Sequence, residues 1–382
     1  MDHNSRLARI IKNVGLVFLS LGVTFLLLET VCFRLLAPAT DMPENQFVDG
    51  VIKYAPGQTG VYRVKSEIAA RYRINENGWN SGHPRYPRAR SSKFRVAIIG
   101  DSYVDALIVD YDRSLAERLE AKLGAARAEV FRFGMSGAPF SQYLHMLRVE
   151  VLPLRPDVVV VNLVHNDFDE SYEFVPGRYT SSFLKLKVEP GALQPVTEIP
   201  PTPYRWKWYE NLRYSAIFRY LVYQQRLDVA RLKALVMGGA AESRPQYLAN
   251  IDVSALDTKL EKTALAVNYL MGEMQKLSQQ HNFALVFLMD GVREDIYAGV
   301  HRTEGARSLN ELAKSLAGER RIPFLDLHPV FEADYRQHRQ PFNYQSDLHW
   351  NAYGHEIAAE TLYNLLAHSV RLASPPGPGQ NP

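Results

Sequence analysis

Apolar residues along this chain fall into two patterns: one long uninterrupted stretch near the N-terminus, and short runs spaced through the rest. The uninterrupted stretch, Gly15–Leu28, contains no charged residue. With its neighbours it gives the 20 positions 14–33, in which Glu29 is the single charge. A bilayer core of about 30 Å needs roughly that length of helix. The pattern therefore predicts a transmembrane anchor over residues 14–36. We expect Glu29, near the outer end of the stretch, to reach the interface or to pair with Arg34.

The charges on either side of this stretch predict its orientation. Arg6, Arg9 and Lys12 precede it, whereas residues 41–44 after it are mildly acidic. Basic residues tend to stay on the cytoplasmic side of a membrane. We therefore expect residues 1–13 in the cytoplasm, one pass through the cytoplasmic (inner) membrane, and the body of the protein facing the periplasm or exterior.

Two other interpretations of the apolar stretch compete with an anchor. A cleaved signal peptide would use a site such as Ala37-Pro38-Ala39, but the apolar run exceeds the usual ~7–15 residues and Arg34 precedes that site. A buried helix of a soluble fold usually has a polar face, and Leu16–Leu28 has almost none. The anchor is the favoured interpretation.

Beyond residue 93, short apolar runs alternate with segments of helical spacing. The runs predict strands at 94–99, 129–133, 157–164, 283–289 and 323–327. The other segments predict helices at 115–123, 140–152, 306–317 and about 352–366. The run Asp157–Val164 is rich in β-branched residues and is typical of a strand buried on both faces of a parallel sheet. This alternation predicts a doubly wound α/β domain whose working residues gather at the carboxyl ends of the strands.

Three further segments complete the expected organisation. Residues 37–93 resemble an irregular preamble, and residues 371–382 a flexible tail. An insertion at about 168–253 separates the third and fourth strands. It carries aromatic residues at helical spacing, namely Trp206, Trp208, Tyr209, Tyr214, Phe218, Tyr220 and Tyr223. We interpret these aromatics as packing; a cap over the site, or a surface facing glycan or membrane, is the alternative.

Composition narrows the classes of function. With 46% hydrophobic and 22% charged residues, the 382-residue chain is not intrinsically disordered overall. The 44 Lys and Arg against 41 Asp and Glu leave a net charge of +3, too small to suggest nucleic-acid binding. A local basic run consists of Arg85, Arg88, Arg90, Lys93 and Arg95. We interpret it as solvated surface, and contact with anionic lipid or acidic glycan is the alternative. The single cysteine, Cys32, excludes an intramolecular disulfide and a cysteine-ligated zinc site.

Polar clusters follow three of the predicted strands and precede the last helix. They are Gly100-Asp101-Ser102, Gly134-Met135-Ser136-Gly137, His165-Asn166-Asp167 and Asp347-Leu348-His349-Trp350-Asn351. A serine after a strand can present its hydroxyl at the top of the sheet, and a histidine held by a carboxylate is the base it requires. Glycine N–H groups and asparagine amides can donate to a developing oxyanion. Each cluster alone could equally be a turn or a helix cap. The phosphate-binding patterns GxxxxGK[ST] and GxGxxG are absent after the first strand, so no nucleotide site is expected.

The order GDS, FGMSG, HND and DLHW resembles the SGNH (GDSL-type) hydrolases, over roughly residues 94–367. The resemblance implies a flavodoxin-like three-layer α/β/α domain, placed at 94–370, with ester or acyl-transfer chemistry that needs no metal or cofactor. By position, it makes Ser102 the nucleophile, His349 the base and Asp347 the residue that orients the base. The oxyanion hole would consist of the Ser102 N–H, the Gly137 N–H and the Asn166 side chain.

The chain departs from the family pattern at two points. Two residues before its asparagine the family usually has glycine, where this chain has Val164. Three residues before its histidine the family usually has Asp, where this chain has Ser346. The DxHW wording is similar to alginate O-acetyltransferase-type SGNH proteins, in which it precedes the GDS block. The role of Asp347 is therefore less defined than that of His349. Further residues are expected at the pocket or holding its loops, namely Asp101, His165, Asp167 and Trp350, with His355 capping or packing against the last helix.

The leading hypothesis is a membrane-anchored serine esterase or O-acyltransferase that works outside the cytoplasm through an acyl-Ser102 intermediate. O-acylated cell-surface polysaccharide is the preferred substrate, with lipid esters next. The first alternative is a non-catalytic SGNH-fold binding or scaffold protein in surface-polysaccharide assembly, supported by Val164 and the altered spacing before His349. The second is a structural membrane-anchored protein in which all four clusters are turns and caps.

Overall fold

The computed structural model describes residues 3–174, 180–205, 207–227, 247–248, 251–252, 256–300 and 305–373. The chain divides into two compact units, each considered by itself. Unit 1 consists of residues 1–42, 61–69 and 206–242, and unit 2 of residues 43–60, 70–205 and 243–382. Residues 374–382 of the expected tail, and parts of the expected insertion, lie outside the described residues.

Unit 2 is built on a five-stranded sheet. Its strands are β5 (Phe94–Gly100), β6 (Ala128–Gly134), β7 (Val158–Leu163), β12 (Ala284–Met289) and β13 (Phe324–Asp326). They pair in the order β13-β12-β7-β5-β6, and every pair is parallel. This confirms the predicted sheet and is the flavodoxin-like order, in which the winding direction reverses between β5 and β7. Such a reversal opens a crevice at the carboxyl ends of those two strands, where ligands bind in this class of fold.

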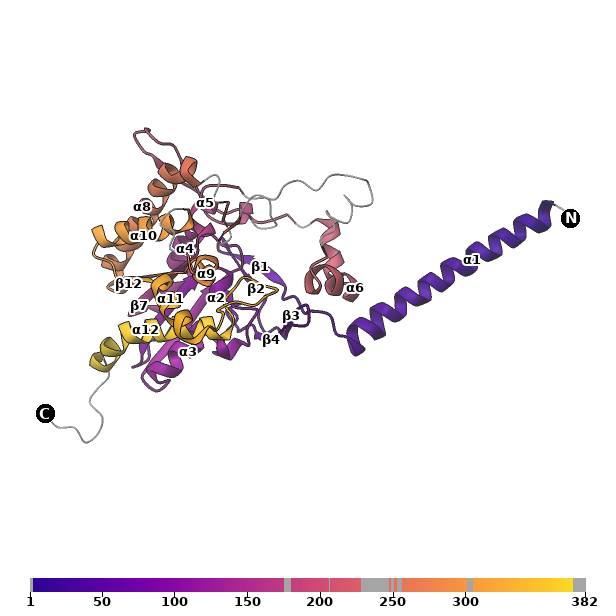
Figure 1. Ribbon diagram of the computed structural model, residues 1–382, viewed down its shortest axis with the longest axis horizontal. Coiled ribbons are helices and arrows are strands. Elements are labelled where there is room, and N and C mark those ends of the chain that lie inside the picture. The colour runs from indigo at the N-terminus through magenta and orange to yellow at the C-terminus, as the bar shows by residue number, and fades with distance from the viewer. Residues whose placement is uncertain are drawn as a thin grey trace. The chain divides into compact units, whose positions relative to one another are not determined.

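Helices cover both faces of the sheet (Figure 1). α3 (Leu115–Leu123) and α12 (Ala352–Ala373) lie on one face, while α4 (Phe140–Met146), α8 (Leu256–His281) and α10 (Ala306–Glu319) lie on the other. Alternate strand residues supply the two cores. Val160 and Leu288 are buried in one core with α3 and α12, whereas the ring of Phe287 meets that of Phe140, on α4, at 6.0 Å. The three-layer α/β/α architecture is confirmed.

Shorter elements complete unit 2. The helical ones are α2 (Ser102–Asp105), η2 (Tyr111–Arg113), η3 (Leu147–Val151), η4 (Leu152–Leu154), α5 (Asn166–Glu170), η5 (Thr180–Ser182), α9 (Arg293–Ala298) and α11 (Leu327–His338). β8 (Lys185–Val188) pairs with β9 (Val196–Ile199), and β10 (Tyr247–Leu248) with β11 (Ile251–Asp252). The helix predicted at 140–152 is the run α4, η3 and η4. The last helix extends beyond its predicted end.

The expectation of an irregular preamble over residues 37–93 is wrong for residues 45–73. Residues 45–73 contain β1 (Asn45–Val48), β2 (Val51–Tyr54), β3 (Thr59–Val64) and β4 (Ile68–Arg73), which pair as two two-stranded sheets. Asp49 and Gly50 join β1 to β2 with φ values of +53° and +74°. An Asp-Gly pair with two positive φ angles is the preferred two-residue hairpin turn, so the signal was present in the sequence.

The basic run before β5 is not solvated throughout. Arg85, Arg88 and Arg90 are exposed, as expected, but Arg95 is fully buried. Its Nε donates to Glu129 at 2.7 Å. A buried guanidinium needs such a partner, because an unpaired charge in the interior is costly.

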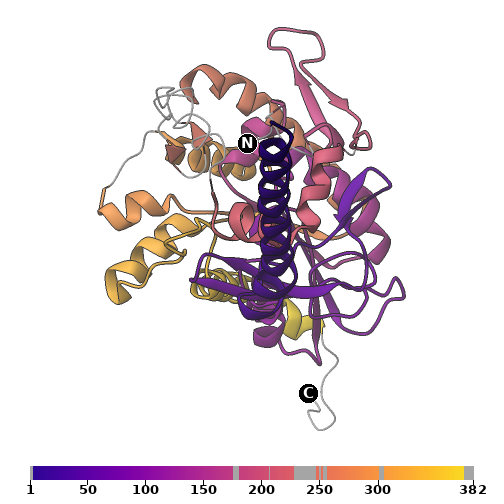
Figure 2. The same ribbon diagram turned by 90° about the vertical axis from the view of Figure 1, so that its right-hand side faces the viewer.

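The N-terminal helix of unit 1 is continuous from α1 (His3–Leu27) into η1 (Leu28–Leu36) (Figure 2). The helix over Arg6–Leu36 is long and apolar enough to cross a membrane, and an 18-residue window within it has a mean hydropathy of 2.2. None of this window is buried, unlike the core helix of a soluble fold, although a signal sequence would have the same properties. The expected pairing of Glu29 with Arg34 is present at 2.8 Å.

The aromatic segment of the insertion also belongs to unit 1. It forms three consecutive short helices, η6 (Trp208–Tyr214), α6 (Ala216–Phe218) and η7 (Arg219–Gln224), rather than one helix. Trp206 lies outside the described residues.

Candidate active site

Ser102 and His349, 247 positions apart in the chain, are joined by a hydrogen bond. Ser102 opens α2 two residues after β5 ends, and its Oγ lies 2.7 Å from His349 Nε2. His349 Nδ1 lies 2.5 Å from Asp347 Oδ1, which also accepts the His349 backbone N–H at 3.0 Å. The two-residue spacing therefore places the carboxylate against the imidazole, with the backbone contact fixing the turn. Together the three side chains form a Ser–His–Asp hydrogen-bonded chain.

The exposure of these side chains suits acid–base chemistry. The His349 side chain is 29% exposed, whereas that of Asp347 is 2% exposed. A substrate can therefore reach the imidazole while the carboxylate behind it is shielded from water. Shielding strengthens the interaction between the carboxylate and an imidazolium, because the local dielectric is low.

Asp101 is a second carboxylate beside the serine. Its Oδ2 lies 3.2 Å from Ser102 Oγ, and its Oδ1 accepts the Tyr103 N–H at 2.9 Å. Burial raises the pKa of Asp101. A hydroxyl carries one hydrogen, so Ser102 donates either to Asp101 or to His349 at any moment. The backbone contact caps the first turn of α2, which is the loop-holding arrangement that the sequence predicted.

Two glycines shape the edge next to Ser102. A Cβ on Gly134 would lie 2.0 Å from the backbone nitrogen of Asp105, so only glycine lets the end of β6 approach α2 this closely. Gly137 has φ +75°, and a Cβ there would meet no atom within 4 Å. The predicted oxyanion donor Gly137 thus borders open space beside the site.

Asn166 begins α5 after β7, with its side-chain amide turned toward Glu170. Asn166 Nδ2 donates to Glu170 Oε1 at 3.1 Å. Burial raises the pKa of Glu170 to about 6. The amide carries a second hydrogen, which finds no acceptor among the residues that the structure describes. Sequence analysis missed Glu170, although the i,i+4 spacing from Asn166 places both on one face of a helix.

The four residues expected at the pocket are buried: Asp101, His165, Asp167 and Trp350. Asp167 accepts the Tyr143 hydroxyl and the Val164 N–H, each at 2.8 Å. His165 Nε2 donates to Asn310 Oδ1 at 2.8 Å, and burial lowers its pKa to about 4. Asp101, Asp167 and Trp350 hold the strand-end loops from within. His165 lines a small cavity with Phe168, Asp169 and Leu309, and neither Ser102 nor His349 is part of that lining. His165 is therefore poorly placed to act as a base on substrate.

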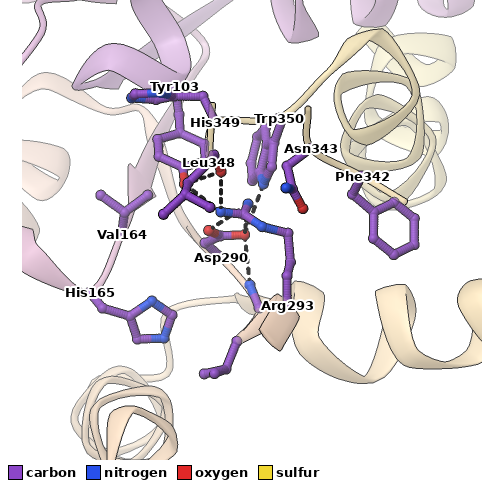
Figure 3. Close-up of polar contacts among 12 residues, drawn as sticks. Tyr103, Val164, His165, Asp290, Arg293, Phe342, Asn343, Leu348, His349 and Trp350 are labelled. Carbon is purple, nitrogen blue, oxygen red and sulfur yellow. Dashed lines mark hydrogen bonds and ion pairs between the residues drawn. The ribbon is translucent and has the colours of Figure 1, made fainter. Parts of the chain in front are cut away.

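A buried ion pair that sequence analysis missed lies beneath the His349 loop (Figure 3). Asp290, directly after β12, accepts Arg293 Nη1 at 3.0 Å and the Trp350 indole N–H at 2.8 Å. Arg293 Nη2 donates to the Leu348 carbonyl and to the Tyr103 hydroxyl, both at 2.6 Å. Arg293 thus links Tyr103, next to Ser102, with Leu348, next to His349. The pair fixes the distance between the two loops.

His355, the remaining candidate imidazole, serves the packing of two helices. It lies in α12 and is buried, and its Nδ1 accepts the backbone N–H of Leu115 at 3.2 Å. That N–H belongs to the first turn of α3, where no intrahelical acceptor exists. Burial lowers the pKa of His355 to about 3, so it stays neutral and structural, as expected.

Asp105, the last residue of α2, has a buried carboxyl that faces Ser136. It accepts the Tyr54 hydroxyl at 2.6 Å and the Ser136 hydroxyl at 3.1 Å. Burial raises its pKa to about 7, although both hydrogen bonds act in the opposite direction. Asp105 therefore keeps its proton to a much higher pH than an exposed aspartate does. Among the described residues, no group of three or more His, Cys, Asp or Glu is arranged to hold a metal ion.

The raised pKa of Asp105 predicts a pH-dependent effect of Asp105→Asn. Ionising the buried carboxyl destabilises the fold, and this loss grows as pH rises from about 4 to 7 and is complete above 7. An amide never ionises, so the melting temperature of Asp105→Asn relative to the wild type should increase between pH 5 and pH 8. Thermal unfolding at both pH values measures this. The exposed Asp112→Asn is the matched control, and a difference that does not change with pH would contradict the prediction.

The site can be compared with known proteins. Residues 250–378 match the family described as SGNH hydrolase-like domain, acetyltransferase AlgX. The match contains Asp347 and His349, together with Asp290 and Arg293, and ends well short of Ser102. No curated protein sequence matches the chain.

Solved structures give weaker likenesses. An acetyl xylan esterase is 13% identical with a TM-score of 0.41, covering 72% of this chain and 100% of its own. A two-domain esterase active on acetylated mannans is 11% identical with a TM-score of 0.40, covering 75% and 53% respectively. A lipase/acylhydrolase from Enterococcus faecalis is 12% identical with a TM-score of 0.38, covering 72% and 96%. At these scores no functional argument rests on them.

Proposed function

We propose that the chain is a serine-dependent ester hydrolase or O-acyltransferase of the SGNH type, a proposal supported by the match of residues 250–378 to the SGNH hydrolase-like domain of AlgX acetyltransferase. The observation that carries the proposal is the hydrogen-bonded chain from Ser102 through His349 to Asp347. It stands at the carboxyl end of β5, beside the crevice where such sheets bind ligands.

The proposed reaction has two steps. Ser102 Oγ attacks the acyl carbonyl carbon while His349 Nε2 takes the hydroxyl proton, and His349 then passes that proton to the departing alcohol oxygen. Water or an acceptor hydroxyl next attacks acyl-Ser102, giving its proton to His349, which returns it to Ser102. The carboxylate of Asp347 stabilises the imidazolium in both steps. Water as acceptor gives hydrolysis, and another hydroxyl gives transfer.

Charge on the carbonyl oxygen has to be stabilised in both steps. The Ser102 and Gly137 N–H groups and the Asn166 amide are the proposed donors. Gly137 supports this because it borders open space, and Asn166 because Glu170 occupies only one of its two amide hydrogens. Each such donor typically contributes about 10²–10³ in rate.

The proposed setting is the outer face of the cytoplasmic membrane, with residues 14–36 as anchor. The apolar N-terminal helix and the basic residues before it support this placement. The substrate we favour is an O-acylated cell-surface polysaccharide, because the domain matches an acetyltransferase family and the enzyme would share a compartment with such polymers.

A fluorophosphonate probe tests for an activated serine. The full chain in detergent is expected to form a covalent adduct at Ser102, which mass spectrometry of peptides would locate. Phosphonylation requires the nucleophile to lose its proton, so His349→Ala should lose labelling while His355→Ala, which changes a buried structural imidazole, should keep it whenever the variant folds. Adduct at another serine would contradict the assignment of Ser102.

The alternative function is a non-catalytic binding or scaffold protein on the same fold. Val164 and the short Asp–His spacing favoured it at the level of sequence. The direct contact between Asp347 and the His349 ring removes the second of these arguments. A folded chain that the probe never labels would favour this alternative over the enzyme.

A further inference from the structure

Within unit 1, the aromatic segment of the insertion is hydrogen-bonded to the C-terminal end of the apolar helix. Where η6 meets α6, the backbone N–H groups of Ala216 and Ile217 donate to the Glu29 carboxylate at 2.7 and 3.1 Å. Ser215 Oγ donates to the same carboxylate at 2.8 Å. Glu29 thus binds the start of a helix nearly 190 positions further along the chain, and α6 lies beside the end of the long helix (Figure 1).

Further contacts join the same two segments. Arg34 Nη2 donates to Glu29 at 2.8 Å and to the Tyr214 carbonyl at 3.3 Å. The ring of Phe33 stacks on that of Tyr220, with centroids 4.3 Å apart. A carboxylate next to an apolar span is costly unless it is paired and hydrogen-bonded. Here Arg34 and three donors from the aromatic segment meet both requirements.

These contacts fix the depth of the segment, given the membrane anchor proposed above. Glu29 directly follows the uncharged stretch Gly15–Leu28. At 1.5 Å per residue, a bilayer core of about 30 Å takes roughly 20 residues of helix. A span that contains Gly15–Leu28 therefore has its outer boundary within about two helical turns of Glu29. Since α6 is hydrogen-bonded to Glu29, it lies at the same level.

The two short helices on either side of α6, η6 and η7, carry exposed apolar and aromatic side chains. Trp208 is 81% exposed, Tyr214 51%, Leu212 46% and Leu221 39%. Trp and Tyr concentrate at membrane–water interfaces, because each ring is apolar and carries one polar group. Short helical segments with such exposed residues are typical of elements that lie in the interface.

We propose that residues 208–224 lie in the outer lipid–water interface as a second membrane contact. Lipid would contact the side chains of Trp208, Leu212, Tyr214 and Leu221. The hydrogen bonds of Glu29 would hold this segment against the end of the membrane span. The aromatic segment is then neither ordinary core nor a cap over the active site. Its partner is the bilayer itself.

Depth-dependent fluorescence quenching tests this proposal on the full chain. The protein is reconstituted in phosphatidylcholine vesicles brominated near the headgroup or near the chain end, with Trp206→Phe in every variant. The remaining indoles besides Trp208 are those of Trp79 and Trp350, which are fully buried. Shallow bromines should quench more strongly than deep ones, and Trp208→Phe should lose most of this quenching.

Two controls separate this inference from the anchor on which it rests. Trp79→Phe removes a buried indole and should leave the quenching unchanged. Flotation with the vesicles reports the anchor: a chain that does not float overturns the anchor and the interfacial segment together. A chain that floats, but whose quenching is the same with and without Trp208, overturns the interfacial segment alone.

Discussion

Replacing Ser102 by Ala is expected to lower the turnover of small acetyl esters by about 10³- to 10⁶-fold, the largest effect of any single substitution in the site. The variant keeps the backbone N–H of Ser102 and every oxyanion donor, so substrate binding should change little. It lacks the oxygen that forms the acyl-enzyme. Steady-state hydrolysis of a chromogenic acetate, with the full chain in detergent, measures the loss.

The matched control is Ser136→Ala, which removes another hydroxyl at the same edge of the sheet. Ser136 is exposed and donates to Asp105, with no contact to His349. It should keep turnover within about tenfold of the wild type, since an exposed hydroxyl contributes little. His349→Ala should lose nearly as much activity as Ser102→Ala, and the double variant little more, because residues that act as a unit are not additive. If Ser102→Ala retained a tenth of the activity, the acyl-serine reaction would be wrong.

The sheet and the position of Ser102 were predictable because both depend on local pattern. Five apolar runs alternate with helical spacing, and such strands can only be buried if helices cover both faces. Ser102 and Asn166 each follow a strand, so both reach the same edge of a parallel sheet. The pairing of His349 with Ser102 could be predicted from the order of the four polar clusters along the chain.

The supports of the site were not predictable in the same way. Arg293 bonds Tyr103 and Leu348, which come from opposite ends of the domain, and no spacing rule connects them. The burial of two further polar residues has a related cause. Asp167 and Trp350 carry polar groups, but their partners Tyr143 and Asp290 are supplied by other segments, which lets both lie inside the core.

The hairpin of β1 and β2 was missed although its turn is local. Asp49-Gly50 is a strong turn signal, but the flanking strands are four residues each and do not alternate cleanly between apolar and polar positions. The hydrogen bonds between Glu29 and residues 215–217, by contrast, are not local in sequence. They depend on two segments meeting in space, so only the Arg34 part of that cluster was visible in the sequence.

Asp347→Ala is expected to lower turnover by about 10²- to 10⁴-fold, a loss exceeded in the site only by those of Ser102→Ala and His349→Ala. Asp347 Oδ1 accepts both the backbone N–H and the ring nitrogen of His349, so the substitution removes the orientation and the charge together. Asp347→Asn separates these two contributions. Its amide oxygen can accept the same two hydrogen bonds, but it carries no charge to stabilise the imidazolium. The Asn variant should therefore lie between Ala and the wild type.

Asp101→Asn decides which carboxylate serves the histidine. Asp101 contacts Ser102 and the Tyr103 N–H, and no hydrogen bond joins it to His349 within the described part of the chain. An amide oxygen can still cap Tyr103, so turnover should fall much less than in Asp347→Ala. Steady-state rates of the three variants, each checked for its melting temperature, make the comparison. If the turnover of Asp347→Ala stayed within tenfold of the wild type while that of Asp101→Asn fell strongly, Asp101 would be the carboxylate that supports His349. The short spacing before His349 would then be the mark of a site that departs from the family pattern.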